Sequence, residues 1–125
     1  MTDVTLKQVS DLDYYKGERA IPGMKFRSAA RELGVTAWGM NVIEIDAGCK
    51  AYPEHDHLKD GQEEVYVVLE GSAMMQSGSE KWSLEVGSLV RVGPGAKRKF
   101  TPGPNGVTLL AIGGTPGKPY EPRRS

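Results

Sequence analysis

Residues 48–71, Gly-Cys-Lys-Ala-Tyr-Pro-Glu-His-Asp-His-Leu-Lys-Asp-Gly-Gln-Glu-Glu-Val-Tyr-Val-Val-Leu-Glu-Gly, decide the fold of this 125-residue chain. His55 and His57 are its two histidines, and they lie one residue apart. In an extended strand, residues i and i+2 point to the same face, so both imidazoles can meet at one point. Glu64 follows within a short loop, and imidazole with carboxylate is a ligand set that zinc, iron, manganese, nickel and copper accept. The pattern predicts a metal site; the alternative is two surface histidines beside ordinary acidic residues.

This stretch resembles the first signature of the cupin family, which consists of a glycine, a His-x-His pair, a glutamate and a closing glycine. Those five places are taken by Gly48, His55, His57, Glu64 and Gly71. The resemblance implies that the two histidines and the glutamate hold one divalent transition metal.

The identity of the carboxylate ligand depends on how the signature is aligned. The interval after His57 is longer than usual in the family, so Gln62 keeps the usual distance from the histidines, whereas Glu64 keeps the usual distance from Gly71. We favour Glu64, because the strand sets the register and the extra residues can bulge the loop. Glu63 is the second choice and Gln62 the third.

A second cupin signature, a glycine followed by Pro-x-Gly and a last histidine, is expected downstream. Residues 87–98 occupy that place but depart from the pattern twice. Gly93 stands where the proline is usual, with Pro94 one position later, and Arg98 stands where the last histidine is usual. The resemblance covers roughly residues 36–113 and implies an all-β, double-stranded β-helix or jelly-roll barrel.

Short apolar runs separated by glycine and proline agree with such a barrel. We expect a loop at Pro102–Gly106 and one helical turn at Ser28–Leu33, capped by Ser28 and stopped by Gly34. We divide the chain into an N-terminal extension (1–35) that packs on the barrel or a dimer partner, the barrel (36–113) and an extended tail (114–125). About eight strands are predicted, at Met24–Arg27, Thr36–Asp46, Glu64–Glu70, Ser72–Gln76, Glu80–Leu84, Ser88–Val92, Lys97–Thr101 and Val107–Ile112.

Arg98 cannot replace a histidine as a metal ligand, because a guanidinium stays protonated and has no lone pair to give. Three roles remain open for it. It clamps an anionic group of a substrate, it pairs with Glu64 or Glu63, or it points outward with Lys97 and Lys99. Alternation along a strand places Arg98 with Phe100 and opposite both lysines, which argues against a basic nucleic-acid patch.

Two classes of function follow. The first is a metal-dependent dioxygenase or isomerase for a small anionic organic molecule, in which Arg98 orients the substrate and Tyr66, or else Tyr52, donates a hydrogen bond or proton. The second is a non-catalytic cupin that binds a small ligand without metal, or a structural homodimer. The missing fourth ligand motivates this second class.

Composition narrows the setting. Sixteen basic and sixteen acidic residues give a net charge of zero, which removes the general electrostatic argument for nucleic-acid or membrane partners. Cys49 is the single cysteine, so no intrachain disulfide forms. The first residues lack the apolar core of a signal peptide, and no apolar run has the length of a membrane span. We expect a cytoplasmic protein, and the family resemblance implies a homodimer.

Overall fold

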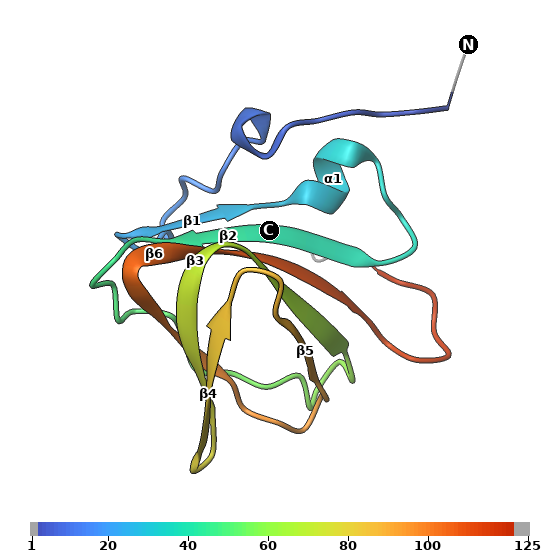
Figure 1. Ribbon diagram of the computed structural model, residues 1–125. Helices are drawn as coiled ribbons and strands as arrows, with labels where there is room; N and C mark the ends of the chain where they lie inside the picture. The colour runs from blue at the N-terminus through green and yellow to red at the C-terminus, as the bar shows by residue number, and fades with distance from the viewer. Residues whose placement is uncertain (1–2, 122–125) are drawn as a thin grey trace.

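Two long strands, β3 (Glu63–Ser77) and β6 (Lys99–Gly114), form the centre of one antiparallel six-stranded sheet. The sheet curls on itself (Figure 1) in the order β1-β2-β6-β3-β4, with β5 on the same edge of β3 as β4. The computed structural model describes residues 3–121. The predicted all-β barrel with one short helix near the N-terminus is confirmed. The remaining elements are η1 (Val9–Asp11), β1 (Met24–Arg27), α1 (Ala29–Leu33), β2 (Gly39–Ile45), β4 (Glu80–Glu85) and β5 (Leu89–Val92).

Within residues 3–121 there are six strands rather than eight, because two pairs of predicted strands are continuous. β3 runs through Gly71, and β6 runs through Pro102–Gly106, which was wrongly predicted to be a loop. The pairing steps from Gly71 with Val107 to Ala73 with Pro102, so the intervening residues of β6 bulge out of register. Gly71 has a φ of 72°, and a Cβ there would lie 2.1 Å from the carbonyl oxygen of Gly106. These glycines bend a pair of strands instead of ending them.

Other boundaries differ by smaller amounts. β2 begins three residues later than predicted, and residues 97 and 98 precede β6. Ser28 is the N-cap residue of α1, but its side chain makes no capping hydrogen bond, whereas Gly34 ends the helix in the left-handed conformation as predicted. β6 includes Gly114, which was assigned to the tail. Residues 122–125 of that tail lie outside the described part of the chain.

The barrel interior is filled by side chains that alternate inward along the strands. On β6, Phe100 and Leu109 are fully buried, and Tyr66 and Val68 of β3 face them with 2% exposure each. The ring of Phe100 packs against Tyr66 at 4.7 Å and edge-on against Tyr52 at 5.2 Å. Tyr52 also contacts the ring of His55, so this aromatic group lies next to the histidines.

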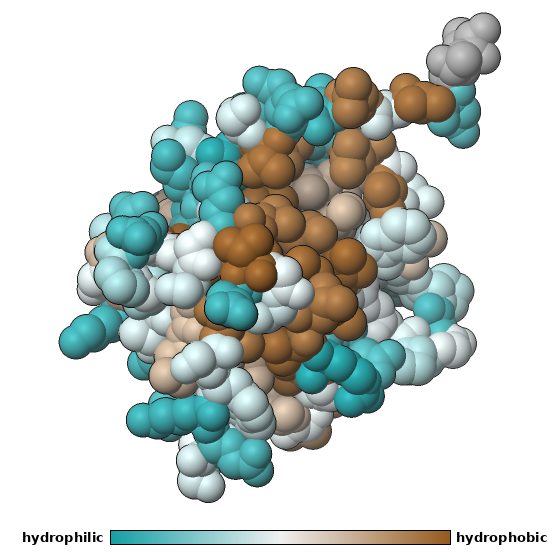
Figure 2. Space-filling view, in the orientation of Figure 1, coloured by the Kyte–Doolittle hydropathy of each residue, from teal (hydrophilic) through white to brown (hydrophobic). Residues whose placement is uncertain are grey.

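The outer face of the sheet is also apolar. The N-terminal segment covers part of it, with Leu12 buried against Val42 and Ala29. Figure 2 shows a continuous hydrophobic area below that segment, over the region where Figure 1 places β2, β3 and β6. On this outer face, Leu69 lies with Val42 and Leu110, and Leu89, which pairs with Val67, is 72% exposed. Within residues 3–121, none of the helices has the length and apolarity needed to cross a bilayer.

Candidate metal site

The structure brings His55, His57 and Glu64 together. One potential ligand atom from each lies within 4.8 Å of the other two, and all three side chains are half-buried. Glu64 comes from the start of β3, and the histidines come from the segment before it. The backbone of His55 exchanges two hydrogen bonds with Arg98, and the His57 N–H donates to the Pro94 carbonyl. The two sequence signatures are therefore joined by backbone pairing at the site.

Each imidazole is oriented through its Nδ1 atom. His55 Nδ1 donates to the Pro53 carbonyl oxygen at 3.0 Å, and His57 Nδ1 lies 3.1 Å from both carboxylate oxygens of Asp60. Carbonyl and carboxylate oxygens can only accept, so Nδ1 carries the proton in each neutral ring. Each Nε2 atom then keeps a lone pair, which is the state that a metal ligand needs.

The Oε1 atom of Glu64 is the meeting point of the site. It accepts a 2.6 Å hydrogen bond from the Tyr66 hydroxyl and a 3.3 Å hydrogen bond from Arg98 Nη1. His57 Nε2 lies 3.0 Å from the same oxygen, yet it makes no hydrogen bond within residues 3–121 and is buried. A bare imidazole nitrogen facing a carboxylate oxygen is a repulsive pair unless a proton or a metal cation lies between them. The donors present therefore fit a divalent metal.

Arg98 is fully buried, which excludes the third of the roles left open for it, an outward orientation with Lys97 and Lys99. Its Nη1 donates to Glu64 and its Nη2 donates to the Gly93 carbonyl at 3.0 Å, while Nε has no hydrogen-bond partner within the described residues. Of the predicted roles, the pair with Glu64 is the one that these contacts form. Arg98 and Phe100 are buried, whereas Lys97 is exposed and Lys99 is half-buried. Burial therefore alternates along residues 97–100.

The side chains at the two alternative ligand positions make other contacts. Glu63 makes a 2.6 Å ion pair with Arg91 at the surface. The Gln62 side chain lies against Gly113 of β6, where its oxygen would be 3.3 Å from an added Cβ. The carboxylate in the cluster is that of Glu64, and the extra residues after His57 form a turn before β3.

Two tyrosine hydroxyls lie beneath Glu64. Burial raises the pKa of Tyr52 to about 12, with the nearby Glu64 carboxylate adding to the shift and the Tyr66 hydroxyl and Arg98 opposing it. Burial also raises the pKa of Tyr66, together with the neighbouring Tyr52 and Glu64. Both phenols therefore stay protonated near neutral pH. Tyr66 donates its hydrogen bond to the Glu64 carboxylate.

Sequence reasoning missed Asp60 and the Pro53 carbonyl, the two acceptors that hold the imidazoles. The His57-Leu-Lys-Asp60-Gly61 sequence carried a signal for Asp60, because aspartate before glycine favours a turn that brings positions i and i+3 together.

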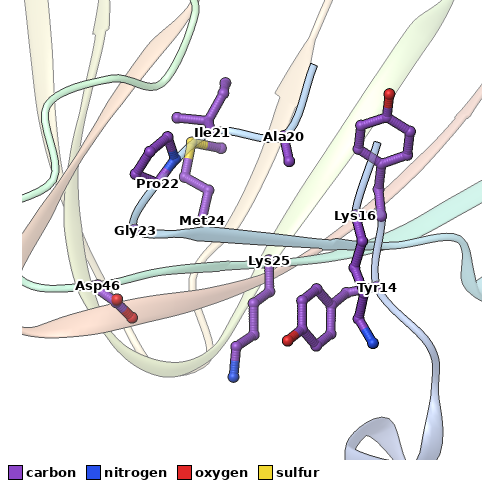
Figure 3. Close-up of a pocket in the computed structure, with 10 residues that line it drawn as sticks. Tyr14, Lys16, Ala20, Ile21, Pro22, Gly23, Met24, Lys25 and Asp46 are labelled. Atoms are coloured by element: carbon purple, nitrogen blue, oxygen red, sulfur yellow. The ribbon is translucent and has the colours of Figure 1, made fainter. Parts of the chain in front are cut away.

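A separate pocket of about 320 Å³ lies beside the N-terminal segment (Figure 3). Lys16 and Lys25 approach the ring of Tyr14 there, at 4.8 and 5.3 Å from its centroid. None of the predicted site residues lines this pocket.

Comparisons with known proteins establish the fold. Neither a protein-family model nor a curated protein matches the sequence. Among solved structures, a sugar phosphate isomerase of the cupin superfamily from Silicibacter pomeroyi is 17% identical with a TM-score of 0.73, covering 87% of this chain and 74% of that one. A cupin protein from Bacteroides fragilis is 22% identical with a TM-score of 0.65, covering 89% and 92%. Fe(II)-HppE with the alternative substrate (S)-1-HPP is 19% identical with a TM-score of 0.64, covering 87% and 59%. This chain has the cupin fold with a His-His-Glu cluster in its barrel.

Proposed function

We propose that the protein is a metal-dependent cupin enzyme that acts on a small anionic organic molecule by dioxygenation or isomerisation. The observation that carries the proposal is the convergence of His55, His57 and Glu64, with both Nδ1 atoms already held by acceptors. The metal is one of iron, manganese, nickel, copper or zinc. When bound, it supplies a Lewis acid with positions open to water or substrate. The solved structures with this fold include a sugar phosphate isomerase and an Fe(II) protein.

In this proposal, the residues around the metal ligands control the Glu64 carboxylate. Tyr66 donates to Oε1 and remains protonated, so it orients the carboxylate and does not exchange a proton near neutral pH. Arg98 donates a hydrogen bond to the same oxygen, and its positive charge offsets the negative charge of the carboxylate. An anionic substrate can reach the Arg98 guanidinium only if the side chain becomes exposed, because it is fully buried here.

The Arg98–Glu64 pair also favours a second function, a metal-free cupin that binds a small ligand without catalysis. A guanidinium 3.3 Å from Glu64 Oε1 already provides the countercharge that a metal would provide. Under this alternative, the buried pair is structural and the open side of the site binds an uncharged or anionic molecule.

Two neighbouring carboxylates provide a matched test. Glu64→Gln should abolish iron binding and turnover, whereas Glu63→Gln should retain both, because Glu63 pairs with Arg91 at the surface. Turnover is measured on metal-loaded protein by oxygen consumption with small acids and phenols, and by NMR with sugar phosphates. Equal activity in the two variants would contradict the proposed site. Ligand binding by a wild-type protein that takes up no metal would favour the alternative.

We further propose that the protein is a cytoplasmic homodimer that lacks nucleic-acid and membrane partners. The extended segment before η1 exposes Val4 and Leu6, at 79% and 82%, and the apolar outer face of the sheet exposes Leu89. A second copy would cover both surfaces.

Sedimentation equilibrium tests the dimer. Leu89→Glu should shift the protein from dimer to monomer, because it introduces a charge into the proposed interface. Leu58→Glu, at a leucine of similar exposure (67%) on the loop before β3, is the matched control and should remain dimeric. A monomeric wild-type protein at tens of micromolar would contradict the dimer.

A further inference from the structure

The residues inserted between His57 and Glu64 form an ordered turn against the site. The Gly61 N–H donates to the His57 carbonyl at 2.8 Å, and Gly61 has a φ of 67°, so a glycine suits this position. This turn places Asp60 beside the imidazole of His57. The insertion that lengthens the cupin signature is therefore in contact with a candidate metal ligand.

Asp60 is fixed by several contacts at once. Both of its carboxylate oxygens lie 3.1 Å from His57 Nδ1, and Oδ1 also accepts from the Gln62 N–H at 3.1 Å. Its carbonyl oxygen accepts a 2.8 Å hydrogen bond from the hydroxyl of Thr115, the residue that follows β6. The carboxylate is thus held at the ring from its own turn and from the far end of the barrel strand.

The two histidines are oriented by different kinds of acceptor. His55 donates to a backbone carbonyl, that of Pro53, whereas His57 faces a side-chain carboxylate. A carboxylate behind a ligating imidazole selects the tautomer, fixes the ring plane and makes the opposite nitrogen a stronger donor to a metal. The Asp60 side chain is 44% exposed, so solvent weakens this effect without removing the hydrogen-bond geometry.

We propose that Asp60 is a positioning residue for the metal site: it holds His57 in the Nδ1–H tautomer with Nε2 directed at Glu64, and the inserted turn serves to place it. Thr115 fixes the turn to the end of β6. The part of this inference that concerns metal affinity rests on the proposed function. The part that concerns the imidazole does not.

The tautomer is measured first, on metal-free protein. Nitrogen-15 NMR distinguishes a protonated from a bare nitrogen in each imidazole ring. Wild type and Asp60→Asn should keep a proton on Nδ1 of His57, because the Asn amide oxygen can still accept. Asp60→Ala should populate the Nε2–H form, while His55 should be unchanged because its acceptor is a backbone carbonyl.

Metal affinity is measured second, with zinc against a competing chelator. Asp60→Ala should lower affinity about tenfold, near the lower end of the range for such outer-shell partners, and Asp60→Asn should restore most of it. Asp56→Asn is the charge control: Asp56 lies between the histidines and accepts from the Leu58 N–H rather than from a ring. It should change affinity by less than about threefold. Thr115→Val should produce a smaller loss than Asp60→Ala in the same direction.

The two readouts separate the hypotheses. An unchanged His57 tautomer in Asp60→Ala would overturn the inference, as would a loss of zinc affinity in Asp56→Asn equal to that in Asp60→Ala. A wild-type protein that binds none of iron, manganese, nickel, copper and zinc would contradict the proposed function, and the tautomer measurement would then decide the role of Asp60 by itself.

Discussion

Arg98 and a metal ion would share the same carboxylate oxygen. Glu64 Oε1 already accepts from Tyr66 and Arg98, and His57 Nε2 lies 3.0 Å away. The permanent positive charge of Arg98, 3.3 Å from this oxygen, repels a second cation. The strength of metal binding therefore depends on residue 98 as well as on the ligands.

Arg98→His should tighten zinc binding by about tenfold or more, because it removes a repelling charge and adds an imidazole donor beside Glu64. The measurement is chelator competition on wild type and variant, with thermal unfolding as a check of folding. Arg98→Met is the control; it removes the charge without adding a ligand and should give a smaller gain. Unchanged or weaker binding in Arg98→His would show that residue 98 does not face the metal.

At this scale, some positions were predictable from the sequence and others were not. Glu64 was chosen as the carboxylate ligand because it keeps the usual distance from Gly71 along the strand. The side chains of a strand alternate between its two faces, so this distance decides which face Glu64 is on. Alternation with Phe100 placed Arg98 inward. Asp60 was missed because its position depends on the conformation of a turn, and on the Thr115 hydroxyl 55 residues later in the chain.

At the scale of elements, the glycines of β3 and β6 were misread. Gly71 and the 102–106 segment have the composition of turns, and local sequence cannot distinguish a turn that ends a strand from a bulge that bends it. The difference lies in pairing: the Gly71 segment and the Gly106 segment face each other across the two strands. That contact is between distant parts of the chain, so it was not visible in either segment alone.

Gly71→Ala should therefore cost more stability than an ordinary substitution of a left-handed glycine. Its Cβ would lie 2.1 Å from a backbone oxygen that cannot move independently of β6. The matched control is Gly78→Ala, at φ 60°, where nothing lies within 4 Å of the added Cβ. The control should lose about 1–2 kcal/mol of unfolding free energy in urea, and Gly71→Ala should lose about 3 kcal/mol or more. Equal losses would show that the two strands are not in close contact at the bulge.

At the scale of the whole molecule, the barrel contains a polar group inside an apolar core. Tyr52 and Tyr66 are buried beside Phe100, and they link that core to Glu64 and Arg98. The fold was predictable because its apolar periodicity and both signatures agree. The Arg98–Glu64 pair was one of the roles considered for Arg98, but the hydrogen bond from Tyr66 to Glu64 was not foreseen, because it depends on side-chain geometry that no spacing encodes.

This burial predicts a loss of stability in alkali. The Tyr52 pKa is about 12 when folded and about 10 when unfolded, so from pH 10 to 12 the unfolded chain binds fewer protons. Stability from this group is complete below pH 10 and falls as the pH rises toward 12. Tyr52→Phe should therefore reduce the wild-type loss over this range by about 2 kcal/mol, measured by urea unfolding with a chelator present. The difference between the two proteins should be constant from pH 7 to 8; a constant difference up to pH 12 would contradict the burial of a protonated hydroxyl.

The measurement that tests the account most directly is the metal content of protein purified without an affinity tag or chelator, beside a His55→Ala/His57→Ala double variant. We expect about one equivalent of iron, manganese, nickel, copper or zinc per chain in the wild type and almost none in the double variant. Metal far below stoichiometry that added ions do not restore would contradict this expectation and favour a site closed by the Arg98–Glu64 pair. Equal metal content in the two proteins would show that any bound metal is held elsewhere.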